Sequence, residues 1–236
     1  MGKLTILDDY QIEFLKLVLK EPYILKRFYW TGGTVLSEFY LNHRESHDID
    51  LFSETQEVHL PSINKFIGIA GNKLGAIKII YSKFLGLHTY TLFLPNRELK
   101  VDFNYYPFRR INTSKKWKGL EIDSLEDITA NKIQTISTNA RERDFVDLYF
   151  INKKKKIDLK KMIVLAKTKF DWHIDPIQLG KIFLQIRDEK HGNWKGNKVG
   201  YSAIHTWVAR RLGNYQKCDQ CEDTTAKVYD WANISG

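Results

Sequence analysis

The sequence has 236 residues, of which 43% are apolar, enough for one large domain or two small ones with a substantial core. No apolar run approaches the ~20 residues of a membrane span, so we expect a cytoplasmic protein with no membrane partner. The only cysteines, Cys218 and Cys221, are too few for a disulfide framework. Their spacing also suits a redox pair or half of a zinc site, but no second pair completes four ligands.

The amino-terminal third predicts a helix, a strand and a glycine turn. Residues 1–20 predict an amphipathic helix, because apolar side chains recur at helical spacing after two aspartates. An aromatic, β-prone run then ends at Gly32 and Gly33, and a helical pattern begins at Thr34. Paired glycines permit a tight turn and leave backbone amides free to meet an anion. The segment therefore indicates a phosphate-binding turn, with an ordinary strand-to-helix turn as the alternative.

Two carboxylates follow this turn, in the segment Arg44-Glu-Ser-His-Asp-Ile-Asp50. A strand alternates its side chains between faces, so Asp48 and Asp50 would share one face while Ile49 and Leu51 enter a core. Like charges on one face repel, and a cation between them relieves the repulsion. The pair therefore predicts a site for Mg²⁺ or Mn²⁺, with two surface aspartates as the alternative.

A third carboxylate follows on a later predicted strand. After strands expected over residues 76–81 and 89–94, the segment 98–105 alternates, with Lys100, Asp102 and Asn104 on its polar face. Asp102 is therefore expected on a strand of the same sheet, as a third metal ligand, or else as an exposed strand position. Three aspartates from two strands can supply the ligands that bound metal ions need.

The sequence after residue 124 is predominantly helical in pattern. We expect helices over residues 125–138, 142–151, 158–169, 176–188 and 201–212. In the first of these, Lys132 falls within an apolar stripe, where a charge is costly without a partner. That partner is a triphosphate, or Asp144 or Asp147 of the next helix, unless the lysine stem reaches solvent.

The net charge of +9 falls largely on this second half. Lys153–Lys156, Lys160 and Lys161 flank an apolar helical pattern, and further basic and aromatic residues are interleaved later, namely Lys190, Lys195, Lys198, Arg210 and Arg211 with Trp194, Tyr201 and Trp207. Such a surface suits a nucleic-acid backbone, with aromatic rings available for stacking. A solvated lysine face is the alternative.

The overall expectation is an α+β fold. A small mixed β-sheet core with an N-terminal helix would occupy residues 1–122 as the catalytic domain, and a mainly helical C-terminal domain would occupy residues 123–236.

The motifs together resemble the nucleotidyltransferase fold related to polymerase β, and in detail the AbiEii/AbiGii-type nucleotidyltransferase toxins. The resemblance covers residues 32–148. It rests on the glycine turn, the Arg-x-Ser-x-Asp-x-Asp-Leu-Phe segment and Asp102. It also rests on Asp127-Ile-Thr-Ala-Asn-Lys132, similar to that family's third motif, and Arg143-Asp-Phe-Val-Asp-Leu148, similar to its fourth. Thr34 stands where the wider superfamily carries serine.

The resemblance implies a role for each matching residue. The metal ligands would be Asp48, Asp50 and Asp102, and these act in catalysis together with Lys132 and Asp147. The nucleotide would be bound by Gly32, Gly33, Thr34, Arg44, Ser46 and Lys132. Arg143 and Asp144 would support the site.

The implied activity is Mg²⁺-dependent transfer of a nucleoside monophosphate from an NTP to an acceptor, with release of pyrophosphate. The resemblance further implies the toxin of a bacterial toxin–antitoxin or phage-defence pair, with tRNA as acceptor and a cognate antitoxin as partner. Two other functions stay open, namely a non-catalytic RNA- or partner-binding module and a small-molecule nucleotidyltransferase. A pure binding module would not need Asp48, Asp50, Asp102 and Lys132, so their presence argues against the first function. The basic second half of the chain argues against a cationic small-molecule substrate.

Overall fold

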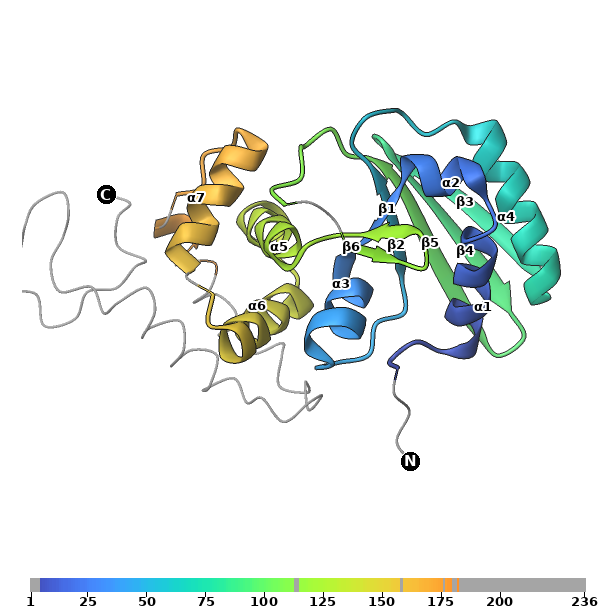
Figure 1. The fold of residues 1–236 in the computed structure, drawn as a ribbon, viewed down its shortest axis with the longest axis horizontal. Helices are drawn as coiled ribbons and strands as arrows, with labels where there is room; N and C mark the ends of the chain where they lie inside the picture. The colour runs from blue at the N-terminus through green and yellow to red at the C-terminus, as the bar shows by residue number, and fades with distance from the viewer. Residues whose placement is uncertain (1–4, 113–114, 158, 176, 180–181, 183–236) are drawn as a thin grey trace, which may run out of the picture. The chain divides into compact units, whose positions relative to one another are not determined.

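The computed structural model describes residues 5–112, 115–157, 159–175, 177–179 and 182 (Figure 1). The chain divides into two compact units, Met1–Ile128 and Thr129–Gly236. The division falls inside a helix, a few residues after the expected boundary between residues 122 and 123, and the extents of the two functional domains stay a prediction.

A seven-stranded mixed sheet forms the first unit, with the strand order β3-β4-β5-β2-β1-β7-β6. Its strands are β1 (Tyr29–Thr31), β2 (Ile49–Ser53), β3 (Lys78–Phe84), β4 (Leu87–Leu94), β5 (Arg97–Tyr105), β6 (Lys115–Trp117) and β7 (Leu120–Ile122). β2 runs parallel to β5 and β1 runs parallel to β7, whereas the other neighbouring strands are antiparallel. The α+β class predicted from the sequence is confirmed.

Alternation of side chains gives the sheet one apolar and one polar face. In β2, Ile49 and Leu51 are fully buried, whereas Asp50 and Phe52 are only partly buried. β4 repeats this pattern over its whole length. β3 lies at the edge of the sheet and all its residues are exposed. The polar face of the central strands is therefore the face available to carry a site.

Four helical segments belong to this unit: α1 (Asp9–Val18), α2 (Pro22–Arg27), α3 (Gly32–Val35), which continues as the π-helical η1 (Leu36–Leu41), and α4 (Leu60–Leu74). α1 confirms the helix expected near the amino terminus, and Asp8 and Gln11 close a reciprocal capping box at its start. Phe14 of α1 packs edge-on against Phe66 of α4, with ring centroids 5.5 Å apart. In Figure 1, α1 and α4 cover the same side of the sheet.

The second unit is helical in its described part. Its helices are α5 (Leu125–Asn139), α6 (Glu142–Lys155) and α7 (Leu159–Phe170). The hydroxyl of Ser124, just before α5, accepts a hydrogen bond from the Asp127 backbone amide at 3.0 Å. These three helices confirm the predictions for residues 125–169. None of the helices in the described ranges has the length and apolar character that a transmembrane crossing requires.

Several sequence predictions fall outside the described residues. The helix over 176–188 is described only at 177–179 and 182, and the helix over 201–212 is not described. The same holds for the basic and aromatic residues from Lys190 to Arg211 and for Cys218 and Cys221.

Candidate active site

Asp50 and Asp102 lie directly opposite one another on neighbouring parallel strands. The register of β2 and β5 pairs Asp50 with Asp102, between the buried pairs Ile49–Val101 and Leu51–Phe103. Side chains paired in register leave a sheet on the same side, so both carboxylates belong to the polar face. Asp102 is 5% exposed, which makes its charge costly without partners.

Asp48 is placed differently from the expectation. β2 begins at Ile49, so Asp48 belongs to the segment before the strand, and the prediction that both aspartates lie in the strand is wrong for Asp48. Its backbone carbonyl accepts a hydrogen bond from the Thr34 hydroxyl at 2.5 Å. The backbone of the first aspartate is therefore tied to Thr34, the residue that follows the two glycines.

The glycine turn lies against the Asp50 side chain. Gly32 begins α3 with a φ of +83°, in the left-handed region that favours glycine. A Cβ atom at this position would overlap the Asp50 carboxylate. Glycine is therefore required here for its backbone conformation and for the close approach of the carboxylate.

Arg44 and Ser46 close around the next glycine. A Cβ atom on Gly33 would lie 2.5 Å from Arg44 Nη2 and 3.3 Å from Ser46 Oγ. The Thr34 hydroxyl lies 2.8 Å from Ser46 Oγ, and Thr34 is fully buried. The structure thus gathers five of the six residues predicted to bind nucleotide around one turn, all except Lys132, and it directs the Thr34 hydroxyl into the protein.

Lys100 and Thr89 were not predicted as site residues, yet they hold the two oxygens of Asp102. Lys100 Nζ donates to Asp102 Oδ2 at 2.9 Å, and Thr89 Oγ1 donates to Asp102 Oδ1 at 2.6 Å. Partial burial lowers the pKa of Lys100, but its hydrogen bond to Asp102 and the charges of Asp102, Asp48 and Asp50 outweigh this and raise it. The alternation of residues 98–105 already placed Lys100 on the Asp102 face, and that signal could have identified it.

The donor chemistry of this face fits a hard divalent cation. Asp50 and Asp102 offer carboxylate oxygens, the ligands that Mg²⁺ prefers, side by side on two strands. Within the described ranges, no group of three or more His, Cys, Asp or Glu side chains is arranged to hold a metal ion. The metal-binding roles of Asp48, Asp50 and Asp102 therefore stay a prediction.

A second charged cluster lies in the helical unit. Lys132 of α5 is 6% exposed, and its Nζ lies 2.6 Å from Asp144 Oδ1 and 2.7 Å from Asp147 Oδ2 of α6. Both aspartates are fully buried. Of the partners considered from the sequence, the structure shows the two aspartates, and the lysine stem does not lead to solvent.

Arg141 is the arginine that joins this cluster. Its Nε donates to Asp144 Oδ2 at 2.9 Å, across one turn at the start of α6. Arg143, which the family resemblance proposed as a supporting residue, is exposed. The i, i+3 spacing of Arg141 and Asp144 was the available signal.

Solved structures share this fold. The chain superposes on the crystal structure of a candidate nucleotidyltransferase from H. pylori with a TM-score of 0.56 and 16% sequence identity, covering 87% of this chain and 94% of that one. It superposes on JHP933 from Helicobacter pylori with a TM-score of 0.54 and 17% identity, covering 86% and 87%. The architecture is therefore that of nucleotidyltransferases.

The sequence comparison is more specific. Residues 19–200 match the family described as nucleotidyl transferase AbiEii toxin, type IV toxin–antitoxin system. The chain is also 25% identical over 194 residues to the uncharacterised protein aq_aa25 of Aquifex aeolicus, covering 81% of this chain and 89% of that protein. The chain belongs to the AbiEii family of nucleotidyltransferase toxins and is a nucleotidyltransferase. Membership implies an NTP substrate and an antitoxin partner.

Proposed function

We propose that this enzyme transfers a nucleoside monophosphate from an NTP to an RNA acceptor, tRNA in particular, and releases pyrophosphate. One observation carries the proposal: Asp50 and Asp102 stand opposite each other on one sheet face, with the Gly32 turn against Asp50. Transfer to a hydroxyl needs a group that binds the triphosphate and carboxylates that organise the reacting phosphate. The polar face of the first unit carries the two carboxylates, and the Gly32 turn lies against one of them.

The carboxylates would hold Mg²⁺ or Mn²⁺. Asp50 and Asp102, joined by Asp48, would be the ligands, and the bound cation would neutralise phosphate charge and lower the pKa of the acceptor hydroxyl. Thr89 fixes the rotation of the Asp102 carboxylate through its hydrogen bond to Oδ1. Asp102 is thereby held in one orientation before any ligand arrives.

The triphosphate would be bound by the glycine turn and its neighbours. The amides of Gly32 and Gly33 and the guanidinium of Arg44 supply donors for phosphate oxygens. Ser46 would contribute through its hydroxyl, and Thr34 would hold Ser46 and the Asp48 backbone in place.

Lys132 and Asp147 of the helical unit are also proposed as catalytic residues. We assign Lys132 to the neutralisation of triphosphate charge, with Asp144 and Asp147 orienting its ammonium. Asp147 would also assist deprotonation of the acceptor, and Arg143 would support the nucleotide from the surface.

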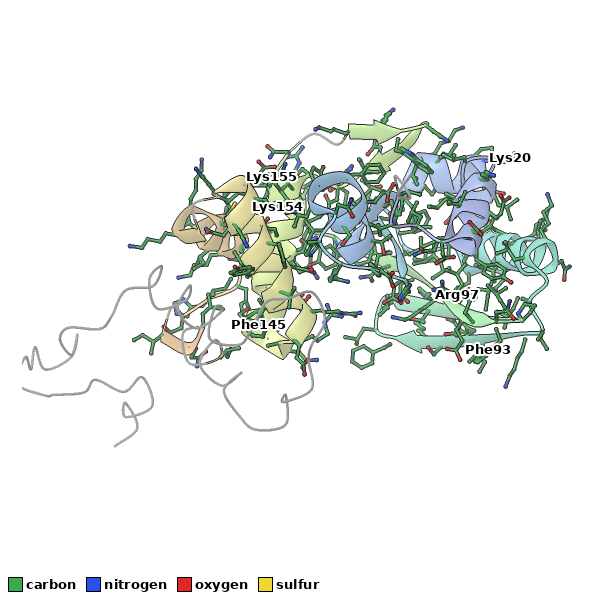
Figure 2. All side chains as sticks on the ribbon, turned by 90° about the horizontal axis from the view of Figure 1, so that it is seen from below. Lys20, Phe93, Arg97, Phe145, Lys154 and Lys155 are labelled. Carbon is green, nitrogen blue, oxygen red and sulfur yellow. The ribbon has the colours of Figure 1, made fainter. Side chains whose placement is uncertain are left out.

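The acceptor assignment is supported by charge. Lys153, Lys154, Lys155 and Lys156 are all exposed at the end of α6, and the labelled Lys154 and Lys155 mark that end in Figure 2. Lysines neutralise a phosphate backbone without reading its sequence. We therefore propose that the enzyme acts on RNA in the cytoplasm as the toxin of a toxin–antitoxin or phage-defence pair, controlled by a cognate antitoxin.

The identity of the acceptor is tested with labelled NTPs. The wild-type protein is incubated with each NTP labelled in its α-phosphate, Mg²⁺ and total cellular RNA, and the products are separated before and after ribonuclease treatment. We expect label in a ribonuclease-sensitive band of tRNA size, lost in Asp50→Asn and kept in Glu57→Gln, whose carboxylate is exposed. Label in ribonuclease-resistant protein or in a small molecule would contradict the RNA assignment.

A further inference from the structure

Lys100 carries a positive charge into the carboxylate face of the sheet. It lies two residues before Asp102 on β5, so both side chains leave the strand on the same side. Its Nζ is 2.9 Å from Asp102 Oδ2, and its side chain is 40% exposed against 7% for Asp102. The charges of Asp48 and Asp50 also act on this ammonium. It is therefore a counter-charge that pairs with Asp102 and is also attracted by Asp48 and Asp50.

The contacts of Asp102 define which oxygen this ammonium uses. Thr89 on β4 takes Oδ1, and Lys100 takes Oδ2. The register places Thr89, Asp102 and Asp50 in one row across three strands. The neutral Thr89 hydroxyl occupies Oδ1 of Asp102. A metal cation would therefore compete with the Lys100 ammonium for Oδ2.

We propose that Lys100 is a positioning residue that serves as the internal counter-ion of the aspartates and exchanges with the divalent cation at Asp102. This inference rests on the proposed function. In the metal-free protein the ammonium offsets the repulsion among the carboxylates, which would otherwise oppose folding. When the cation binds Asp102, the ammonium leaves Oδ2 and becomes a donor for the triphosphate.

The exchange gives Lys100 two opposite effects that a purely structural residue would not have. Its removal eliminates a competitor for Asp102, so Mg²⁺ binds more tightly. Its removal also takes away one cation for the phosphates, so the NTP binds more weakly. In the absence of metal, the repulsion among the aspartates loses the offset that Lys100 provides, and the melting temperature falls.

The test is a calorimetric titration of Mg²⁺ alone, followed by thermal unfolding with and without Mg²⁺. Lys100→Gln is compared with the wild type, with Lys100→Arg, which keeps the charge, and with Lys65→Gln, which removes an exposed lysine of α4. We expect the Kd for Mg²⁺ to fall about tenfold in Lys100→Gln, as for loss of one charge near a protein surface. The stabilisation by Mg²⁺ should increase in parallel, and both controls should resemble the wild type.

The outcomes separate this inference from the proposed function. If wild type and Lys100→Gln bind Mg²⁺ equally, the exchange is refuted and the proposed function stands. If neither binds Mg²⁺, the metal step of the proposed function is refuted together with the exchange. If Lys100→Gln fails to fold, Lys100→Met, which retains the apolar stem, replaces it. An unchanged Kd for Mg²⁺ in Lys100→Met would likewise refute the exchange.

Discussion

The close approach of Gly32 to Asp50 makes this glycine a direct test of the site geometry. Gly32→Ala introduces a Cβ that overlaps the Asp50 carboxylate, at a backbone φ of +83° that already disfavours side chains. We expect loss of nucleotidyl transfer and a reduced free energy of unfolding, measured by label transfer and denaturant titration.

Gly75 is the matched control for this substitution. It has a φ of +71°, but no atom lies within 4 Å of the position of an added Cβ. Gly75→Ala should therefore cost only the backbone strain, about 1–2 kcal/mol, and retain transfer. Equal activity in the two alanine variants would show that the contact of Gly32 with Asp50 has no role in the reaction.

His88 should make the stability of the protein depend on pH. It is 7% exposed and lies 2.9 Å from the Tyr81 hydroxyl, and burial, followed by the charge of Lys83, lowers its pKa. The unfolded chain therefore binds a proton at His88, near pH ~6.5, more readily than the folded protein does. The resulting stability is fully present above pH ~6.5 and is lost as the pH falls toward the lowered pKa.

The measurement is the difference in unfolding free energy between wild type and His88→Gln across pH 5 to 8. Glutamine keeps a polar group for Tyr81 but does not titrate in this range. We expect the wild type to lose stability relative to the variant on acidification. A difference that does not vary with pH would assign the effect to other groups.

Among the secondary structure elements, α5 and α6 are joined by the buried Lys132 cluster. The ammonium of Lys132 on α5 is paired with two buried aspartates of α6, Asp144 and Asp147. Removing one partner of a buried ion pair leaves an uncompensated charge. We expect Lys132→Met to lower the free energy of unfolding by about 3 kcal/mol.

A double variant checks this account. Adding Asp147→Asn to Lys132→Met removes one of the two carboxylates that lose the Lys132 ammonium, so part of the lost stability should return in denaturant titrations. Asp144 keeps Arg141 as a partner in both variants. Additive losses in the double variant would mean that Lys132 and Asp147 do not interact energetically.

The end of α6 is where the acceptor prediction is tested. Replacing Lys153, Lys154, Lys155 and Lys156 by glutamine should weaken tRNA binding and reduce the slope of log K against log salt by several units, because fewer counterions are released. NTP binding should be unchanged. Binding is measured by fluorescence anisotropy of labelled tRNA at several salt concentrations.

An equal change of charge elsewhere provides the control. Glutamine at the exposed Lys65, Lys73, Lys78 and Lys83 of the first unit alters net charge by the same amount. This variant should keep a steeper slope than the α6 variant. Equal slopes would mean that the net charge of the chain, rather than the α6 lysines, governs binding.

Local patterns predicted the elements that have a clear period. Alternation identified β5, and the helical period identified α5. α4 was missed although Ile63, Phe66, Ile67 and Ala70 recur at helical spacing, so its signal was available. β6 and β7 have three residues each, too few for a period to be recognised.

The contacts between side chains were harder to predict from the sequence than the strands and helices. The Asp50–Asp102 pairing depends on the register of two strands separated by about fifty residues, and no local pattern specifies such a register. The Lys100–Asp102 ion pair depends on the rotamers of two residues on one face. Family resemblance supplied the proposed roles of Asp50 and Asp102, whereas Lys100, and Arg141 beside Asp144, were not predicted as site residues.

In the molecule as a whole, a carboxylate face in the first unit is combined with a basic second unit that is helical in its described part. The chain's net charge of +9 favours encounter with polyanions, and NTP and RNA are both polyanions. Binding of either polyanion is therefore weak evidence for catalysis. The fate of the individual phosphates is the decisive observation.

The central claim is transfer of a nucleoside monophosphate at the Asp50–Asp102 face, and parallel reactions with α-phosphate-labelled and γ-phosphate-labelled NTP test it most directly. We predict that the α-label moves to the RNA acceptor and the γ-label leaves as pyrophosphate. Both events should be lost in Asp102→Asn and retained in Glu57→Gln. Transfer of the γ-label to the acceptor, or undiminished α-label transfer by Asp102→Asn, would contradict the account.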